Sequence, residues 1–234
     1  MTTYMDIELN EEQERDALLI DERMKSLASV YQLANSIIAG EPISVQVTSV
    51  PAAQAPAWTT GTEIVINAES IETEDFEDMV RLHGLNFHEL SHVLYTPRAG
   101  TNLAQYCIEE GLMPAFNLLE DQRIESMITV KYPSTAPWLT AAVLRWVTGE
   151  PEALDKGYLF VRGRRYLPGE LRGLLRSMFA RRDLLPEIDR IVDAYRLLVF
   201  PTDYDAAKSL IRSMQDVLSK LGTNMPPDPN GHCE

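Results

Sequence analysis

The pattern of apolar and polar positions predicts one long helix, two short strands and then a helical remainder. Apolar side chains recur at helical spacing between Glu11 and Ala39, which predicts a helix with one buried stripe. Asn10 can cap this helix, acidic residues fill its first turn and Gly40 ends it. The stripe consists of Leu19, Met24, Leu27, Tyr31, Ala34 and Ile38.

Two segments after this helix have the pattern of strands. Residues 43–48 alternate apolar and polar side chains, the period of a half-buried strand, and residues 63–67 form a second run of this kind. Residues 50–61 between them are rich in Pro, Ala and Thr and are predicted to be a loop. We therefore expect a small antiparallel sheet formed by the two runs.

The rest of the chain has helical patterning. Thr73 can cap a long helix that Pro97 ends. The last residues, 223–234, hold three prolines among polar side chains and are expected to be a flexible tail. The predicted fold class is α+β and predominantly α-helical. Further helices are expected over residues 102–111, 114–130, 136–148, 168–182, 186–199 and 204–221.

Composition narrows the possible functions and locations. The net charge of -14 argues against a protein that binds nucleic-acid phosphates in general. No apolar run approaches the roughly 20 residues needed to cross a bilayer, and the acidic N-terminus does not resemble a secretory signal. Cys107 and Cys233 provide no disulfide framework, so a reducing cytoplasm is the expected location.

The motif His88-Glu89-Leu90-Ser91-His92 suggests metal chemistry. Residues four apart in a helix share one face, so both imidazoles can reach one ion, for which zinc is the expected metal. Glu89 stands where a carboxylate can take a proton from a water activated by the metal. The alternative is an amphipathic helix that places two histidines on one face without binding a metal.

A third ligand is expected to be a carboxylate from a following helix. His83 is five residues before His88 and points elsewhere, and His232 lies in the predicted tail. The helix over 114–130 carries Glu120 and Asp121 beside an apolar stripe. Adjacent helical positions differ by about 100°, so one of the two carboxylates meets the metal. Glu120 is the favoured ligand, with Asp121 and Asn117 as supporting residues or alternative ligands. The competing interpretation is a solvated face paired with Arg123.

Two segments, 88–98 (HELSHVLYTPR) and 117–125 (NLLEDQRIE), resemble those of known proteins. A helix with His-Glu-x-x-His followed by a helix that supplies Glu resembles the gluzincin branch of zinc metallopeptidases. The chain is more closely similar to metallopeptidase-like domains of bacterial and phage proteins with a von Willebrand factor A module, including proteins similar to a cobaltochelatase subunit. The likeness covers roughly residues 60–130.

The resemblance implies a zincin-like domain over 1–132, a helical subdomain over 133–222 and the tail. It implies His88 and His92 as ligands, Glu89 as general base and Glu120 as third ligand. It also implies that the strand at 63–67 is an edge that pairs with an extended peptide substrate. The 234 residues leave no room for the von Willebrand factor A module, so the chain is either a stand-alone version or part of something longer.

The expected activity is zinc-dependent hydrolysis of peptide bonds. Tyr95 and Arg98 are candidates to donate hydrogen bonds to a developing oxyanion. The alternative is a catalytically silent metal-binding adaptor that works with an AAA+ ATPase or a von Willebrand factor A protein. The arginine-rich stretch 161–183 is either a face neutralised by the chain's own carboxylates or a docking surface for an acidic partner.

Overall fold

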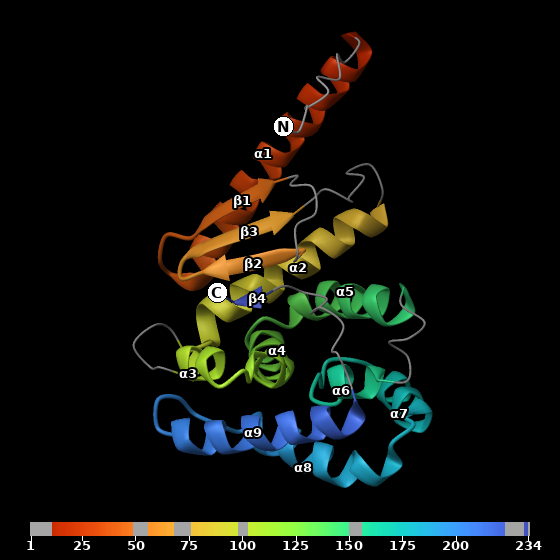
Figure 1. Ribbon diagram of the computed structural model, residues 1–234. Coiled ribbons are helices and arrows are strands. Elements are labelled where there is room, and N and C mark those ends of the chain that lie inside the picture. The colour runs from red at the N-terminus through yellow and green to blue at the C-terminus, as the bar shows by residue number, and fades with distance from the viewer. Residues whose placement is uncertain are drawn as a thin grey trace, which may run out of the picture.

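The computed structural model describes residues 11–48, 56–67, 76–97, 103–149, 156–222 and 232–233. The fold is α+β and predominantly helical, as predicted (Figure 1). A small sheet and two helices lie at one end, and the remaining helices are layered beyond them. The helices are α1 (Glu11–Ala39), α2 (Phe76–Tyr95), α3 (Leu103–Glu109), α4 (Met113–Lys131), α5 (Ala136–Gly149), α6 (Gly157–Val161), α7 (Gly169–Met178), α8 (Leu185–Tyr195) and α9 (Tyr204–Leu221).

Every helix expected from the sequence is present, and α1 and α9 have the bounds that the periodicity predicted. The short helix α6 was not predicted. It has only five residues, too few for a helical period to be recognised.

The sheet is mixed, so the expected antiparallel sheet is wrong in its pairing. Its strands, in the order β1-β3-β2-β4, are β1 (Ser44–Thr48), β3 (Glu63–Asn67), β2 (Ala57–Thr60) and β4 (His232–Cys233). β1 pairs with β3 in parallel, and β2 pairs with β3 antiparallel. Gly61, with a φ of 64°, allows a tight hairpin between β2 and β3, and β2 thereby takes the antiparallel position beside β3.

Two further expectations about the sheet change. The segment that forms β2 was assigned to a loop, because its four residues are flanked by Pro and Ala. β3 lies between β1 and β2, so it is not an edge at which a peptide can add. In the predicted tail, the described residues 232–233 form β4, which pairs in parallel with β2; the other tail residues lie outside the described part of the chain.

Two hydrophobic clusters form the core, and α4 contributes to both. One joins α1, the sheet and α2, and it includes Ile128 of α4 and Leu139 of α5. The other joins α3 and α6–α9 to Phe116 and Leu119 of α4 and to Val143 of α5. The predicted domain boundary near residue 132 falls between two helices that serve both clusters, and it remains a prediction.

The position of α4 between the clusters explains its composition. It is buried on nearly all sides, including its charged residues from Glu120 to Glu125. Buried charges must be paired, so this helix requires polar partners from its neighbours.

No helix in the described part of the chain is long and apolar enough to cross a membrane.

Candidate metal centre

The two histidines of the motif lie one turn apart on α2, in the half of the helix that faces α4. Leu82, Leu85 and Leu90 of α2 pack in the hydrophobic cluster that includes the sheet. His88 is 1% exposed and His92 5% exposed, so both imidazoles are inside the protein. The third motif residue, Glu89, is also buried.

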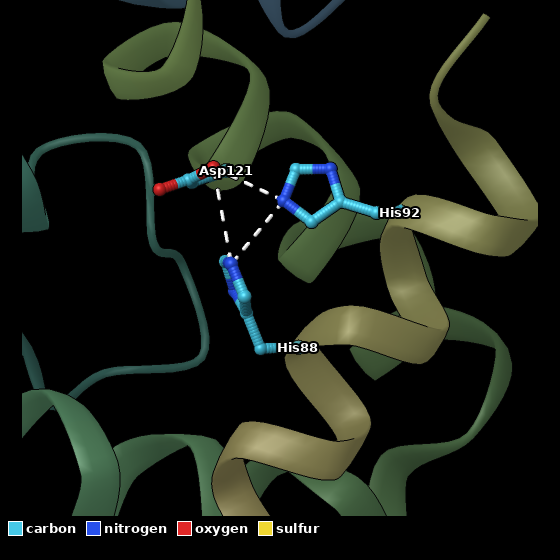
Figure 2. A group of neighbouring side chains, drawn as sticks. All are labelled: His88, His92 and Asp121. Carbon is cyan, nitrogen blue, oxygen red and sulfur yellow. Dashed lines mark hydrogen bonds and ion pairs between the residues drawn. The ribbon is translucent and has the colours of Figure 1, made fainter. Parts of the chain in front are cut away.

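Both histidines and one carboxylate of α4 converge on one point (Figure 2). Nε2 of His88 lies 3.2 Å from Nε2 of His92. Oδ1 of Asp121 lies 3.4 Å from Nε2 of His92 and 4.0 Å from Nε2 of His88. Asp121 is 4% exposed. Within the described part of the chain, these three side chains form a group that could hold a metal ion.

The hydrogen bonds around the group leave its inner atoms available to a cation. Nδ1 of His88 lies 2.8 Å from Oε1 of Glu125. A carboxylate only accepts hydrogen bonds, so Nδ1 is the donor, and Nε2 is the nitrogen left to bind a cation, either a proton or a metal ion. Nδ1 of His92 is engaged by Oγ1 of Thr96 at 2.9 Å. Oδ1 of Asp121 is buried and takes part in no hydrogen bond. Two imidazole nitrogens and a carboxylate oxygen are donors that suit zinc.

The structure places Asp121, and not Glu120, beside the histidines. The Glu120 carboxylate accepts hydrogen bonds from Nε and Nη2 of Arg123 at 2.9 and 2.6 Å. The hydroxyl of Tyr195 also donates to it, at 3.2 Å. The favoured third ligand is therefore corrected: a buried ion pair holds Glu120 on another side of α4, and the alternative ligand Asp121 takes its place.

An outer layer of charge surrounds His88. Arg164 donates from Nε to Oε2 of Glu125 at 2.5 Å and from Nη2 to Oε1 at 2.9 Å. The hydroxyl of Tyr166 donates to Oε2 of Glu125 at 2.5 Å. Burial alone would raise the pKa of the Glu125 carboxyl. Arg164 and the hydrogen bond with His88 outweigh burial, and they hold this pKa well below its ordinary value.

Electrostatics also favour a positive charge inside the group. Burial lowers the pKa of His88, but the carboxylates of Asp121, Glu125 and Glu89 outweigh it and raise this pKa to about 10. Burial raises the pKa of Asp121 to about 6 against the opposing effect of His88 and Arg164. The surrounding carboxylates therefore stabilise a cation at this position, whether it is a proton or a metal ion.

The other predicted site residues lie around this group or outside the described chain. Asn117 is buried one turn before Asp121 on α4. Tyr95 ends α2, and its buried hydroxyl makes no hydrogen bond with the described residues. Arg98 lies outside the described residues. His83 is outside the group, as expected, and its ring instead contacts Tyr31: Nδ1 lies 2.9 Å from the Tyr31 hydroxyl.

Most of the arginine-rich stretch is paired with the chain's own carboxylates. Arg162 contacts Asp189 and Asp193 at 2.5 Å each, and Arg176 contacts Asp189 at 2.7 Å. This agrees with the alternative in which acidic side chains neutralise the basic face. Arg164 differs in position from the other arginines of this stretch, because its side chain is buried beside the candidate metal centre.

Sequence reasoning missed Glu125, Arg164 and Tyr166 as parts of the centre. A signal existed for Glu125: it follows Asp121 by four residues, the same spacing that separates His88 from His92. Nothing in the sequence distinguishes Arg164 from the other arginines of its stretch. Its role depends on a contact between residues 39 positions apart.

Comparisons with protein-family models, with curated proteins and with solved structures find no match to this chain.

Proposed function

We propose that the chain is a zinc-dependent hydrolase of peptide bonds, with the metal held by His88, His92 and Asp121. The observation that carries this proposal is the buried convergence of two imidazole nitrogens and one carboxylate oxygen within 4.0 Å of one another. Three protein ligands are typical of catalytic zinc sites, in which a fourth position stays open for water or substrate. The two nitrogens and one oxygen favour zinc over magnesium or calcium, which prefer oxygen ligands alone.

The residues of the chain have separate roles in this proposal. Zinc at the site would supply the Lewis acidity that activates a water and polarises a carbonyl. Glu89, next to His88 on α2, accepts the proton of the attacking water as general base. Glu125 holds Nδ1 of His88 so that Nε2 stays directed at the group. The peptide bond as substrate comes from the resemblance of the motif to zinc metallopeptidases.

A second candidate is a metal-binding adaptor without catalysis. The burial of the group favours it, because each of the three ligands is at most 5% exposed. A metal there ties α2 to α4, as structural zinc sites do when they stabilise a fold. An AAA+ ATPase or a von Willebrand factor A protein is the partner class that the resemblance implies.

The first experiment measures zinc in the purified protein by elemental mass spectrometry. We expect about one zinc per chain in the native protein and in Glu89→Gln, and none in the double variant His88→Ala/His92→Ala. His83→Ala is the matched control, since it removes a histidine of the same helix outside the group. Native protein that stays free of zinc after zinc is added back would refute the metal centre.

The second experiment separates the hydrolase from the adaptor. The native protein and Glu89→Gln, both loaded with zinc, are incubated with a proteome-derived peptide library, and new termini are counted by mass spectrometry. Cleavage by the native protein alone supports the hydrolase with Glu89 as base. If neither protein cleaves while both bind zinc, the adaptor is the better account. Equal cleavage by both would remove Glu89 from its role.

A further inference from the structure

A segment distant in sequence docks on the polar side of α4. Residues 159–166, here called the clasp, run from the end of α6 towards α7. The side chain of Gln122 donates to the carbonyl of Leu159 at 3.0 Å and accepts from the backbone N–H of Gly163 at 2.6 Å. The hydroxyl of Ser126 donates to the carbonyl of Gly163 at 3.0 Å. The clasp is thus fixed to α4 at Gln122, three residues before Glu125, and at Ser126, directly after it.

Arg164 and Tyr166 of the clasp reach from this docked position to the Glu125 carboxylate. Together with His88 they supply four hydrogen bonds, two to each carboxylate oxygen. Arg164 binds both oxygens at once, and this fork fixes the plane of the carboxylate. Glu125 is fully buried and Arg164 is 2% exposed, so water does not compete for these bonds.

The clasp reaches the proposed metal centre through one further hydrogen bond, and Nη2 of Arg164 also lies 3.8 Å from Oδ2 of Asp121. Oε1 of Glu125 accepts the hydrogen bond from Nδ1 of His88, which sets the tautomer and the ring orientation of His88. The ring then directs Nε2 at His92 and Asp121. A Glu125 carboxylate that lost Arg164 would rotate or recruit another cation, and Nε2 of His88 would no longer be held on the other two ligand atoms.

We infer that the clasp sets the metal affinity of the His88–His92–Asp121 centre, with Arg164 and Tyr166 as positioning residues that act through Glu125. This inference rests on the proposed metal centre. It assigns the helical C-terminal half a role in the centre, since that half supplies the clasp. It holds for either proposed function, hydrolase or adaptor.

Gly163 offers a way to test the clasp without touching any atom of the centre. A Cβ at this position would lie 2.9 Å from Oε1 of Gln122, 2.9 Å from Cγ1 of Val192 and 3.0 Å from Cδ of Arg196. Gly163→Ala therefore displaces the clasp where it packs between Gln122 of α4 and Val192 of α8. In α7, a Cβ at Gly173 meets nothing within 4 Å, which makes Gly173→Ala the matched control.

The experiment measures zinc affinity by competition with a chromophoric chelator, and the visible absorption spectrum of the cobalt(II)-loaded protein. The variants are Arg164→Lys, Tyr166→Phe and Gly163→Ala. Arg165→Lys is the control for Arg164→Lys, because Arg165 is half exposed and pairs with Asp193 at the surface. Urea unfolding of the metal-free proteins is followed in parallel. We expect zinc affinity about 10- to 100-fold weaker for Arg164→Lys and Gly163→Ala, and a smaller loss for Tyr166→Phe.

The outcomes separate this inference from the proposed function. Weaker zinc binding with an altered cobalt(II) spectrum in the three variants, and native behaviour in both controls, supports the clasp. Native affinity and spectrum in folded variants, even with lower unfolding stability, would show that the clasp only holds the fold, and would overturn the inference alone. Native protein that binds no metal overturns both. If Arg164→Lys does not fold, Tyr166→Phe and Gly163→Ala decide.

Discussion

Glu120 and Asp121 are neighbours in sequence, yet the structure predicts that replacing each carboxylate by its amide affects a different property of the protein. Glu120→Gln should lower the unfolding stability of the protein and leave zinc binding intact. Asp121→Asn should weaken zinc binding and leave the metal-free fold largely intact. Each substitution removes one negative charge and keeps the size of the side chain, so the two variants are controls for each other.

The expected loss for Glu120→Gln follows from its buried ion pair. Glu120 is fully buried, accepts two hydrogen bonds from Arg123 and a third from Tyr195. Breaking such a pair from one side leaves Arg123 buried without its counter-charge, which typically costs about 3–5 kcal/mol. For a chain of this size the cost lowers Tm by on the order of 10 °C. Zinc affinity should fall far less than in Asp121→Asn, because the Glu120 carboxylate is bound to Arg123 and Tyr195 and lies outside the proposed ligand group.

The expected loss for Asp121→Asn follows from the proposed ligand set. Its Oδ1 makes no hydrogen bond, and its ion-pair contacts with His92, His88 and Arg164, at 3.4, 4.0 and 3.8 Å, are longer than those between Glu120 and Arg123. The metal-free fold should therefore lose less stability in Asp121→Asn than in Glu120→Gln. Loss of a ligand should cost zinc binding more than loss of an outer hydrogen-bond partner does, hence at least about 100-fold. The assays are thermal and urea unfolding of metal-free protein, and chelator competition for zinc. A Glu120→Gln variant that loses zinc beside an Asp121→Asn variant that keeps it would refute the arrangement.

Two further predictions concern the packing of α2 and the ion pairs of α8. Gly84→Ala should destabilise the protein by about 1–3 kcal/mol in urea unfolding, because its Cβ would lie 2.7 Å from both the carbonyl oxygen of Trp138 and Cβ of Ala142. Gly173→Ala, in open space, should not destabilise it. Burial raises the pKa of the Asp189 carboxyl, but hydrogen bonds from neighbouring side chains outweigh burial and hold this pKa below its ordinary value. A carboxyl whose pKa is lower in the folded than in the unfolded protein stabilises the fold at every pH above its unfolded pKa. This stabilisation is lost as the pH falls through the pKa of the folded protein. The stability difference between the native protein and Asp189→Asn should therefore shrink below about pH 4. A difference that grows on acidification would contradict this. The donors to Asp189 are Tyr158, Arg162 and Arg176.

The helices could be predicted because their apolar stripes and end signals are local. Gly40 ends α1 and Gly222 ends α9, both with positive φ, where the periodic pattern also stops. The pairing of the strands could not be predicted in the same way. Four residues from Ala57 to Thr60 decide it. Trp58, Thr59 and Thr60 favour a strand, but a run of four residues directly after a Pro- and Ala-rich stretch is too short to show a strand period, and the pairing with β3 completes it.

Half of the metal centre could be predicted for the same reason. His88 and His92 share a face in any helix, so their spacing is sufficient to place them together. The carboxylate partner depends on how α4 is rotated about its axis. That rotation could not be read from the sequence, because α4 is buried on nearly all sides and therefore has no single apolar stripe.

The rotation of α4 follows instead from the polar partners on each of its sides. Arg123 and Tyr195 satisfy Glu120 on one side, and the clasp satisfies Gln122 and Ser126 on another. With those residues committed, Asp121 and Glu125 are left to face α2, one turn apart, opposite two histidines that are also one turn apart. Each carboxylate then contacts the histidines in a different way: Asp121 points at the inner nitrogens, and Glu125 accepts a hydrogen bond from the outer nitrogen, Nδ1, of His88. The carboxylate that faces the inner nitrogens is thus decided by the partners of the other polar residues of α4, since an unpaired acid in this helix would be too costly to bury.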